Sequence, residues 1–208
     1  MDAAGGKPHR PFISAKESIF LTMDKQMMAE EIYKLAHWNG EVRMRSGATS
    51  DNYVDPYRFE SDPRLMGAIA WEMSTFVPVG TNVLAGLELG GIPLVTVLSL
   101  ETRIPAVFVR LKAQQYGTGR VAEGAEIAGK RVCVIKDLVS TGTQVLQSVN
   151  DLRAAGANVT DVICVIAQDP EGRRNIEAEG IRFHALFTIE ELTRIGLGGE
   201  EGEPNMEE

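Results

Sequence analysis

Residues 131–153 constrain the fold more than any other stretch, because they combine three patterns in a fixed order. The first is an apolar run that begins at Arg131 and ends in the charged pair Lys136-Asp137, which is typical of a strand buried on both faces. A turn rich in Ser, Thr and Gly follows. Apolar residues then recur at helical spacing from Val145 to Arg153. The stretch therefore predicts one strand–turn–helix unit of an α/β protein.

The turn of this unit predicts an anion site. The first N–H groups of a helix have no internal partner, and the helix dipole is positive at that end. Gly142 lets the backbone approach a ligand closely, while Asp137 is expected where the strand ends. Such a site suits a ligand that carries a phosphate at one end and hydroxyl groups at the other. The alternative is a turn whose Ser and Thr side chains only cap the next helix.

The rest of the chain repeats this alternation. The pattern predicts strands at 42–47, 50–55, 83–87, 104–110, 162–166 and 183–187, and helices at 14–37, 61–73 and about 91–100. Asn39-Gly40 is interpreted as a turn, and residues 113–127 as a mobile active-site loop. Strands that alternate with helices predict a mostly parallel central sheet with helices on both faces. Ligands should then collect where the Glu88, Arg110 and Asp137 segments leave the sheet.

Composition sets the remaining bounds. The 208 residues, of which 44% are hydrophobic and 24% charged, are typical of one soluble domain. Of the net charge of −8, five charges come from glutamates in the last thirteen residues, and no basic surface suggests nucleic acid. Cys133 and Cys164 lie in apolar runs, and no apolar stretch is long enough for a membrane span, so we expect a cytoplasmic protein without a metal site. We expect a flexible arm at 1–12, a domain at 13–195 with a small hood at about 38–60, and a disordered acidic tail at 196–208.

Several motifs together resemble the type I phosphoribosyltransferases, and within them most closely orotate phosphoribosyltransferase. Lys136 to Gly142 is similar to the motif that holds the sugar phosphate of 5-phosphoribosyl 1-diphosphate (PRPP). The other motifs are Ser46-Gly47 with Tyr53-Val54-Asp55 for the hood, Ala85 to Pro93 for the pyrophosphate loop, and Tyr116-Gly117-Thr118 with Glu123-Gly124 for the flexible catalytic loop. The resemblance extends over about Val42 to Leu192.

The resemblance implies the type I phosphoribosyltransferase fold and a reaction. Orotate and PRPP would give orotidine 5′-monophosphate and pyrophosphate, with Mg²⁺ bound through PRPP and no metal site of the protein's own. It also implies a homodimer whose catalytic loops reach the neighbouring site, with no nucleic-acid or membrane partner. The reaction passes through a transition state that resembles an oxocarbenium ion, so the protein must hold PRPP, stabilise the departing charge and exclude water.

The resemblance also implies roles for individual residues. The PRPP-binding set is Lys136, Asp137, Leu138, Val139, Ser140, Thr141, Gly142, Thr143 and Gln144, together with Glu88 and Gly90. The catalytic set is Arg110, Lys112, Tyr116 and Asp137. The acceptor-binding set is Arg45, Ser140 and Asp169.

The sequence departs from the family pattern at several of these positions. Lys136 replaces the first acidic residue, and Leu111 and Gln114 replace the usual loop lysines. Asp169 stands where an arginine usually receives the orotate carboxylate. Since one lost charged donor costs about 3 kcal/mol, or about a hundredfold in rate, two alternatives stay open. One is a phosphoribosyltransferase for a neutral or cationic acceptor, and the other is a non-catalytic regulator that binds PRPP or a nucleotide.

Overall fold

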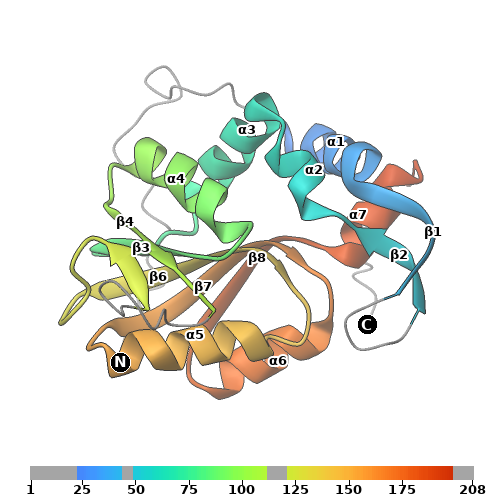
Figure 1. The fold of residues 1–208 in the computed structure, drawn as a ribbon. Coiled ribbons are helices and arrows are strands. Elements are labelled where there is room, and N and C mark those ends of the chain that lie inside the picture. The colour runs from blue at the N-terminus through green and yellow to red at the C-terminus, as the bar shows by residue number, and fades with distance from the viewer. Residues whose placement is uncertain (1–22, 44–48, 112–120, 199–208) are drawn as a thin grey trace, which may run out of the picture.

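A six-stranded sheet forms the centre of the computed structural model, which describes residues 23–43, 49–111 and 121–198 (Figure 1). The strand order is β5-β4-β3-β6-β7-β8, and every neighbouring pair is parallel except β4 and β5. The strands are β3 (Val83–Leu87), β4 (Ala106–Val109), β5 (Ala122–Gly124), β6 (Arg131–Val139), β7 (Asn158–Ala167) and β8 (Arg182–Thr188). The predicted α/β class with a mostly parallel sheet is confirmed.

Helices cover both faces of the sheet, as predicted. In Figure 1, α3 (Pro63–Ser74) and α4 (Gly91–Thr102) lie above the sheet, and α5 (Thr143–Ala154) and α6 (Pro170–Ala178) lie below it. Strand β6 is buried from both sides: Ile135 belongs to the core beneath α3 and α4, and Val134 to the core over α5 and α6. Alternation along a strand places successive side chains on opposite faces, which explains the continuous apolar run.

A small hood stands beside this sheet. It consists of the antiparallel strands β1 (His37–Arg43) and β2 (Thr49–Val54), followed by the short helix α2 (Pro56–Glu60). The strand register shifts between Asn39 and Val42, and Gly40 has a φ of 128°. Asn39-Gly40 is therefore an irregularity inside β1 rather than the predicted turn, because glycine accepts the positive φ that such a bulge requires.

Other element boundaries also differ from the prediction. Helix α1 (Lys25–Ala36) begins later than expected, because the Asp24 side chain caps it by accepting the N–H of Gln26 at 2.7 Å; residues 14–22 lie outside the described part. Strand β6 continues two residues past Asp137, so Asp137 belongs to the strand. Strand β5 lies within the predicted loop 113–127, because it pairs with β4. Helix α7 (Ile189–Gly196) closes the domain.

The terminal predictions concern residues beyond the described ranges. The predicted arm at 1–12 and the tail from 199 onward lie outside them. None of the helices in the described ranges has the length and apolar character that a bilayer crossing requires.

Candidate active site

Two helices that start at neighbouring strands lack a side-chain cap. Helix α5 follows β6 with Gly142 as its N-cap, and α4 follows β3 with Gly90; neither receives a hydrogen bond from a capping side chain. The other five described helices are each capped by an aspartate or threonine side chain. The N-terminal ends of α4 and α5 both lie on the side of the sheet that carries α2 and the hood (Figure 1). Their free N–H groups and dipoles favour bound anions.

The hydroxyl groups of the β6–α5 turn do not cap α5. Thr141 Oγ1 lies 3.0 Å from Thr143 Oγ1, so these two hydroxyl groups bond to each other. The alternative in which the Ser and Thr residues only cap the helix is therefore wrong for α5. The first N–H groups of α5 therefore receive no hydrogen bond from a capping side chain.

Helix α6 holds this turn in place from below. Asn175 Nδ2 donates to the Thr141 carbonyl at 3.0 Å, and a Cβ at Gly172 would overlap the Ser140 carbonyl. Gly142 has a φ of 78°, which disfavours residues with a side chain, and Ile176 packs closely against it: a Cβ at Gly142 would lie 3.1 Å from Ile176 Cγ1. The turn is thus fixed by packing before any ligand binds, which reduces the cost of ordering it on binding.

Asp137 and Lys136 form an ion pair at the end of β6. Lys136 Nζ contacts Asp137 Oδ1, and the two side chains are 13% and 5% exposed. The Lys136 ammonium therefore pairs with Asp137 Oδ1, and the other carboxylate oxygen, Asp137 Oδ2, faces Gly90. Two further residues of the predicted PRPP-binding set contribute mainly their backbone: Val139 is buried in the core, and Leu138 packs against the core on the other face.

Glu60 is a member of this site that the sequence analysis missed. A Cβ at Gly90 would overlap both Asp137 Oδ2 and Glu60 Oε1, so the two carboxyl groups converge on one point from β6 and α2. Glu60 Oε1 is buried without a hydrogen-bond partner. Burial, reinforced by Asp137 and opposed by Lys136, raises the pKa of Glu60 to about 8. A five-residue helix has too little periodicity to mark this position in the sequence.

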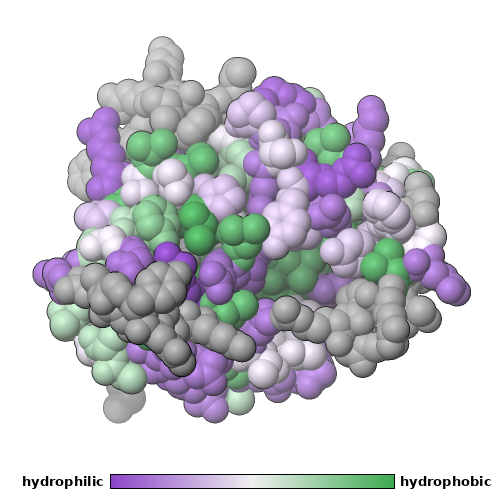
Figure 2. Space-filling model, viewed as in Figure 1, coloured by the Kyte–Doolittle hydropathy of each residue, from purple (hydrophilic) through white to green (hydrophobic). Residues whose placement is uncertain are grey.

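Two tyrosines of the hood lie beside the same carboxylates. Burial raises the pKa of Tyr53, and the charges of Asp55 and Asp137 raise it further. Burial also raises the pKa of Tyr57, again with contributions from Asp137 and Glu60. The predicted hood therefore lies next to the predicted PRPP motif, with Tyr53 and Tyr57 close to Asp137. On the face of the molecule seen in Figure 2, which has the same view as Figure 1, hydrophilic and hydrophobic side chains lie next to each other.

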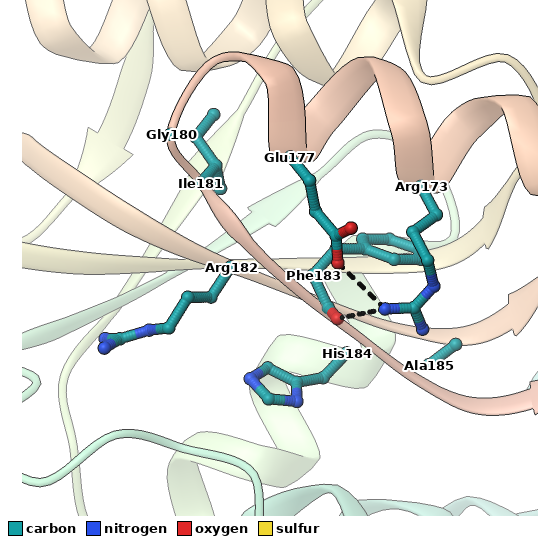
Figure 3. Close-up of a pocket in the computed structure, with 8 residues that line it drawn as sticks. All are labelled: Arg173, Glu177, Gly180, Ile181, Arg182, Phe183, His184 and Ala185. Atoms are coloured by element: carbon teal, nitrogen blue, oxygen red, sulfur yellow. Dashed lines mark hydrogen bonds and ion pairs between the residues drawn. The ribbon is translucent and has the colours of Figure 1, made fainter. Parts of the chain in front are cut away.

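A separate hollow of about 540 Å³ lies at the far edge of the sheet, between β8 and α6 (Figure 3). Its polar groups bond to one another: Arg173 Nη1 donates to Glu177 Oε1 at 2.9 Å and to the Phe183 carbonyl at 3.0 Å. Arg182 and His184 project from the opposite side of the strand (Figure 3). Because β8 is two strands away from β6, this hollow is distinct from the site around Asp137.

The chain is similar to known proteins over most of its length. No protein-family model matches it. It is 41% identical over 172 residues to the orotate phosphoribosyltransferase of Nocardioides sp., which covers 83% of this chain and 96% of that protein. The orotate phosphoribosyltransferase of Thermoplasma volcanium is 37% identical over 169 residues, or 81% of this chain and 100% of that protein. The chain belongs to the orotate phosphoribosyltransferase family.

Solved structures of this family have the same fold. The Mycobacterium tuberculosis orotate phosphoribosyltransferase in complex with Fe(III) dicitrate has a TM-score of 0.71 at 30% identity, over 82% of this chain and 99% of that one. The same enzyme in complex with PRPP has a TM-score of 0.70 at 28% identity, with the same coverage. The predicted type I phosphoribosyltransferase fold is thereby confirmed.

In this member of the orotate phosphoribosyltransferase family, Glu88 holds the base of the predicted catalytic loop. The Leu111 N–H donates to Glu88 Oε1 at 2.6 Å, and the Arg110 N–H donates to the Val121 carbonyl at 3.1 Å. Glu88 is thus neither a free turn residue nor a group that faces only solvent. The remaining predicted residues Lys112, Gln114, Tyr116 and Arg45 lie outside the described residues.

Asp169, which replaces the family's orotate-binding arginine, has a structural partner. It is the N-cap of α6, and its Oδ1 accepts the N–H of Glu171 at 2.7 Å. One residue, Gln168, separates it from the end of β7, and the Gln168 N–H donates to the Val139 carbonyl at the end of β6 at 2.8 Å. Its carboxylate is therefore partly neutralised by a helix start, which weakens the argument that it repels an anionic acceptor.

Proposed function

We propose that this protein is an orotate phosphoribosyltransferase, which transfers the 5-phosphoribosyl group of PRPP to orotate. The observation that carries the proposal is the pair of uncapped helix starts on either side of Asp137, in a chain that belongs to this family. A phosphate ester joined through a ribose to a diphosphate is a ligand that presents one anion to each helix start and hydroxyl groups between them.

The β6–α5 turn would bind the 5-phosphate. The main-chain N–H groups of residues 140–144 and the hydroxyl groups of Ser140, Thr141 and Thr143 supply its donors. Asp137 Oδ2, the oxygen that Lys136 leaves free, would accept a ribose hydroxyl. This arrangement holds the sugar so that its C1 carbon faces the start of α4.

The β3–α4 turn would bind the diphosphate. Orotate N1 loses its proton to solvent and forms a bond to C1 of the ribose, while the bond from C1 to the diphosphate oxygen breaks and its electron pair leaves with the diphosphate. The N–H groups at Gly90 and the start of α4 stabilise the charge that develops there, together with Arg110 and the loop residues Lys112 and Tyr116.

Mg²⁺ is the proposed cofactor, and it would enter with PRPP. Among the described residues no three His, Cys, Asp or Glu side chains gather to hold a metal ion. Phosphate oxygens are ligands that Mg²⁺ prefers, so PRPP itself supplies a fitting donor set. When bound, the ion neutralises diphosphate charge and makes it a better leaving group.

The acceptor, the assembly and the compartment belong to the same proposal. Arg45, Ser140 and Asp169 are the proposed acceptor-binding residues, in which Arg45 supplies the cation for the orotate carboxylate. We propose a homodimer in which each loop at 111–120 reaches the neighbouring site, and a cytoplasmic protein. Sedimentation of the purified protein at micromolar concentration tests the dimer.

The decisive experiment follows orotate consumption by absorbance with protein, PRPP and Mg²⁺. We expect turnover in the wild type and a loss of about a hundredfold or more in Asp137→Asn, which removes the ribose-facing charge. The control Asp151→Asn changes a half-buried carboxylate on α5 whose Oδ1 accepts from Gln147 Nε2 at 3.1 Å, and it should retain activity. Absence of turnover with orotate would overturn the proposal: pyrophosphate release with a neutral heterocycle would then support the other-acceptor alternative, and PRPP binding alone the regulator.

A further inference from the structure

The carboxyl group of Glu60 has no part in the reaction described so far, although the fold places it firmly in the site. Helix α2 is anchored by Phe59, which is fully buried, and is capped by Asp55, whose Oδ1 accepts the Tyr57 N–H at 3.2 Å. Glu60 is the last residue of this helix. The packing of the hood therefore fixes the backbone from which the Glu60 side chain extends.

Glu60 points to the place where two parts of the ligand meet. Its Oε1 lies against Gly90, the N-cap of α4, and shares that contact with Asp137 Oδ2. This oxygen is buried and has no hydrogen-bond partner within the protein. A buried polar atom without a partner is unfavourable, so a bound group that pairs with it gains affinity.

The surroundings of Glu60 favour its neutral form. Among the described residues, the charges that act on Glu60 are those of Asp137 and Lys136 in β6 and of Asp55, the N-cap of α2. Tyr57 of α2 also interacts with Glu60, and Tyr53 of β2 interacts with Asp55 and Asp137. Burial and the charge of Asp137 outweigh the charge of Lys136, and the pKa of Glu60 rises to about 8. A neutral carboxylic acid donates one hydrogen bond, whereas a carboxylate only accepts and would repel a diphosphate.

We propose that Glu60 is a PRPP-binding residue that acts as a neutral carboxylic acid and donates a hydrogen bond to a ligand oxygen between Asp137 and the start of α4. This inference rests on the proposed function and assigns a role within the same site. Asp137 then serves as the ionised acceptor for a ribose hydroxyl, and Glu60 as the donor to the neighbouring oxygen. Two carboxyl groups that share one point divide the two roles because only one of them is ionised.

Proton linkage follows from this assignment. PRPP binds the protonated protein, so above the pKa of Glu60 each binding event takes up a proton from solution. The dissociation constant of PRPP should then rise about tenfold for each pH unit above the pKa. Neither of the two tyrosines produces this dependence, because burial raises the pKa of both beyond their ordinary value.

Calorimetry with PRPP and Mg²⁺ between pH 7 and pH 9.5 tests the role of Glu60. In the wild type we expect the dissociation constant to rise about tenfold per pH unit above 8, and binding heats in buffers of different ionisation enthalpy should show uptake of about one proton. Glu60→Gln should lose both the rise and the proton uptake, because an amide donates at every pH. The matched control Glu179→Gln, at an exposed glutamate that ends α6, should retain both.

The outcomes separate the two proposals. If PRPP does not bind at any pH, the proposed function fails. If PRPP binds with a dissociation constant that is constant between pH 7 and pH 9.5, or if Glu60→Gln keeps the slope of the wild type, the role of Glu60 fails and the transferase assignment stands. The proton count in the wild type decides the question even if the glutamine variant does not fold, since zero uptake contradicts the inference.

Discussion

Three ionisable side chains define the charge of the site at the residue scale. Lys136 and Asp137 neutralise each other through their ion pair, and Glu60 is neutral below its pKa of about 8. The cluster thus carries little net charge at pH 7, although it contains two acids. A ligand with several negative charges meets the free N–H groups of two helices without strong repulsion from these carboxyl groups.

Glu60 should also affect folding stability, with a sign fixed by its raised pKa. An ordinary glutamate loses its proton near pH 4.5, whereas folded Glu60 keeps it up to about pH 8. Between these values the folded state binds more protons, so the free energy of unfolding falls as pH rises through this window. We expect Glu60→Gln to gain stability over the wild type between pH 5 and pH 8, as measured by urea unfolding. If the difference in the free energy of unfolding between Glu60→Gln and the wild type is the same at pH 5 and at pH 8, this linkage is wrong.

At the scale of elements, α6 supports the β6–α5 turn, the proposed phosphate site. A Cβ at Gly172 would overlap the Ser140 carbonyl, which is backbone and cannot rotate away. Gly172→Ala should therefore displace the turn, weaken PRPP binding at least tenfold and lower the free energy of unfolding by about 1–3 kcal/mol. Calorimetry and urea unfolding measure the two effects.

Gly180→Ala is the control that distinguishes displacement of the β6–α5 turn from a general loss of stability at α6. Gly180 follows the same helix with a φ of 71°, and a Cβ there meets no atom within 4 Å. Alanine at a positive φ costs about 1 kcal/mol of stability, so this variant should lose stability but keep its PRPP affinity. Equal losses of affinity in both variants would mean that α6 acts through stability alone.

A second element-scale contact joins β7 and β8. Arg182 Nε and Nη2 donate to the two oxygens of the buried Asp161 at 2.7 and 2.8 Å. Burial would raise the pKa of Asp161, but the hydrogen bonds from Arg182 and Thr160 hold it below its ordinary value. A lowered pKa stabilises the fold above the ordinary value of 3.8, and this stabilisation is lost as pH falls.

Removing this arginine tests the contact. Arg182→Met leaves the buried Asp161 carboxylate without its cation, with the Thr160 hydroxyl still donating to it, and should lower the free energy of unfolding by about 2 kcal/mol at pH 7. The loss should be smaller at pH 3 than at pH 7, because the stabilisation that the contact provides is lost as pH falls below the ordinary value of 3.8. Arg174→Met, at an exposed arginine of α6, serves as the control and should change stability little at either pH. An undiminished loss at pH 3 would assign the effect to packing instead of charge.

The sequence predicts those elements whose signal is local. The segment 131–153 contains its own strand, turn and helix pattern, so the position of Asp137 and the anion-binding turn follow from it. The place of Glu60 in the site cannot be predicted in this way, because it depends on the contact of α2 with the end of β6, which is distant in the sequence. Strand β5 and the irregularity at Gly40 also escape prediction, since pairing with β4 and with β2 decides them. The capping role of Asp169 is local, and Pro170 after an aspartate was the signal for it.

On the scale of the whole molecule, the site joins segments that are distant in sequence. The hood contributes Glu60, the β3–α4 turn contributes Gly90, strand β6 contributes Asp137, and the β6–α5 turn contributes the proposed phosphate site. A single bound PRPP would therefore connect the hood to both layers of the sheet domain. Ligand at a hundredfold excess over its dissociation constant stabilises a protein by about 2.7 kcal/mol.

Hydrogen exchange should show this connection directly. We expect PRPP with Mg²⁺ to slow amide exchange both at 140–144 and at 56–60. Inorganic phosphate is too small to span from the β6–α5 turn to the hood, so it should slow exchange at 140–144 without protecting 56–60. Protection of 56–60 by phosphate, or its absence with PRPP, would contradict a ligand that spans from the turn to the hood. Mass spectrometry of peptides from the full-length protein gives the measurement.

The two bare helix starts also limit how this chain can adapt to heat. An aspartate or serine at an N-cap is worth about 1 kcal/mol in most helices and is a common route to thermostability. At Gly90 any side chain would collide with the carboxyl groups of Glu60 and Asp137, and at Gly142 the backbone conformation disfavours one. A more heat-resistant descendant must therefore find its gains in other parts of the molecule, because improving these two helices would close the binding site.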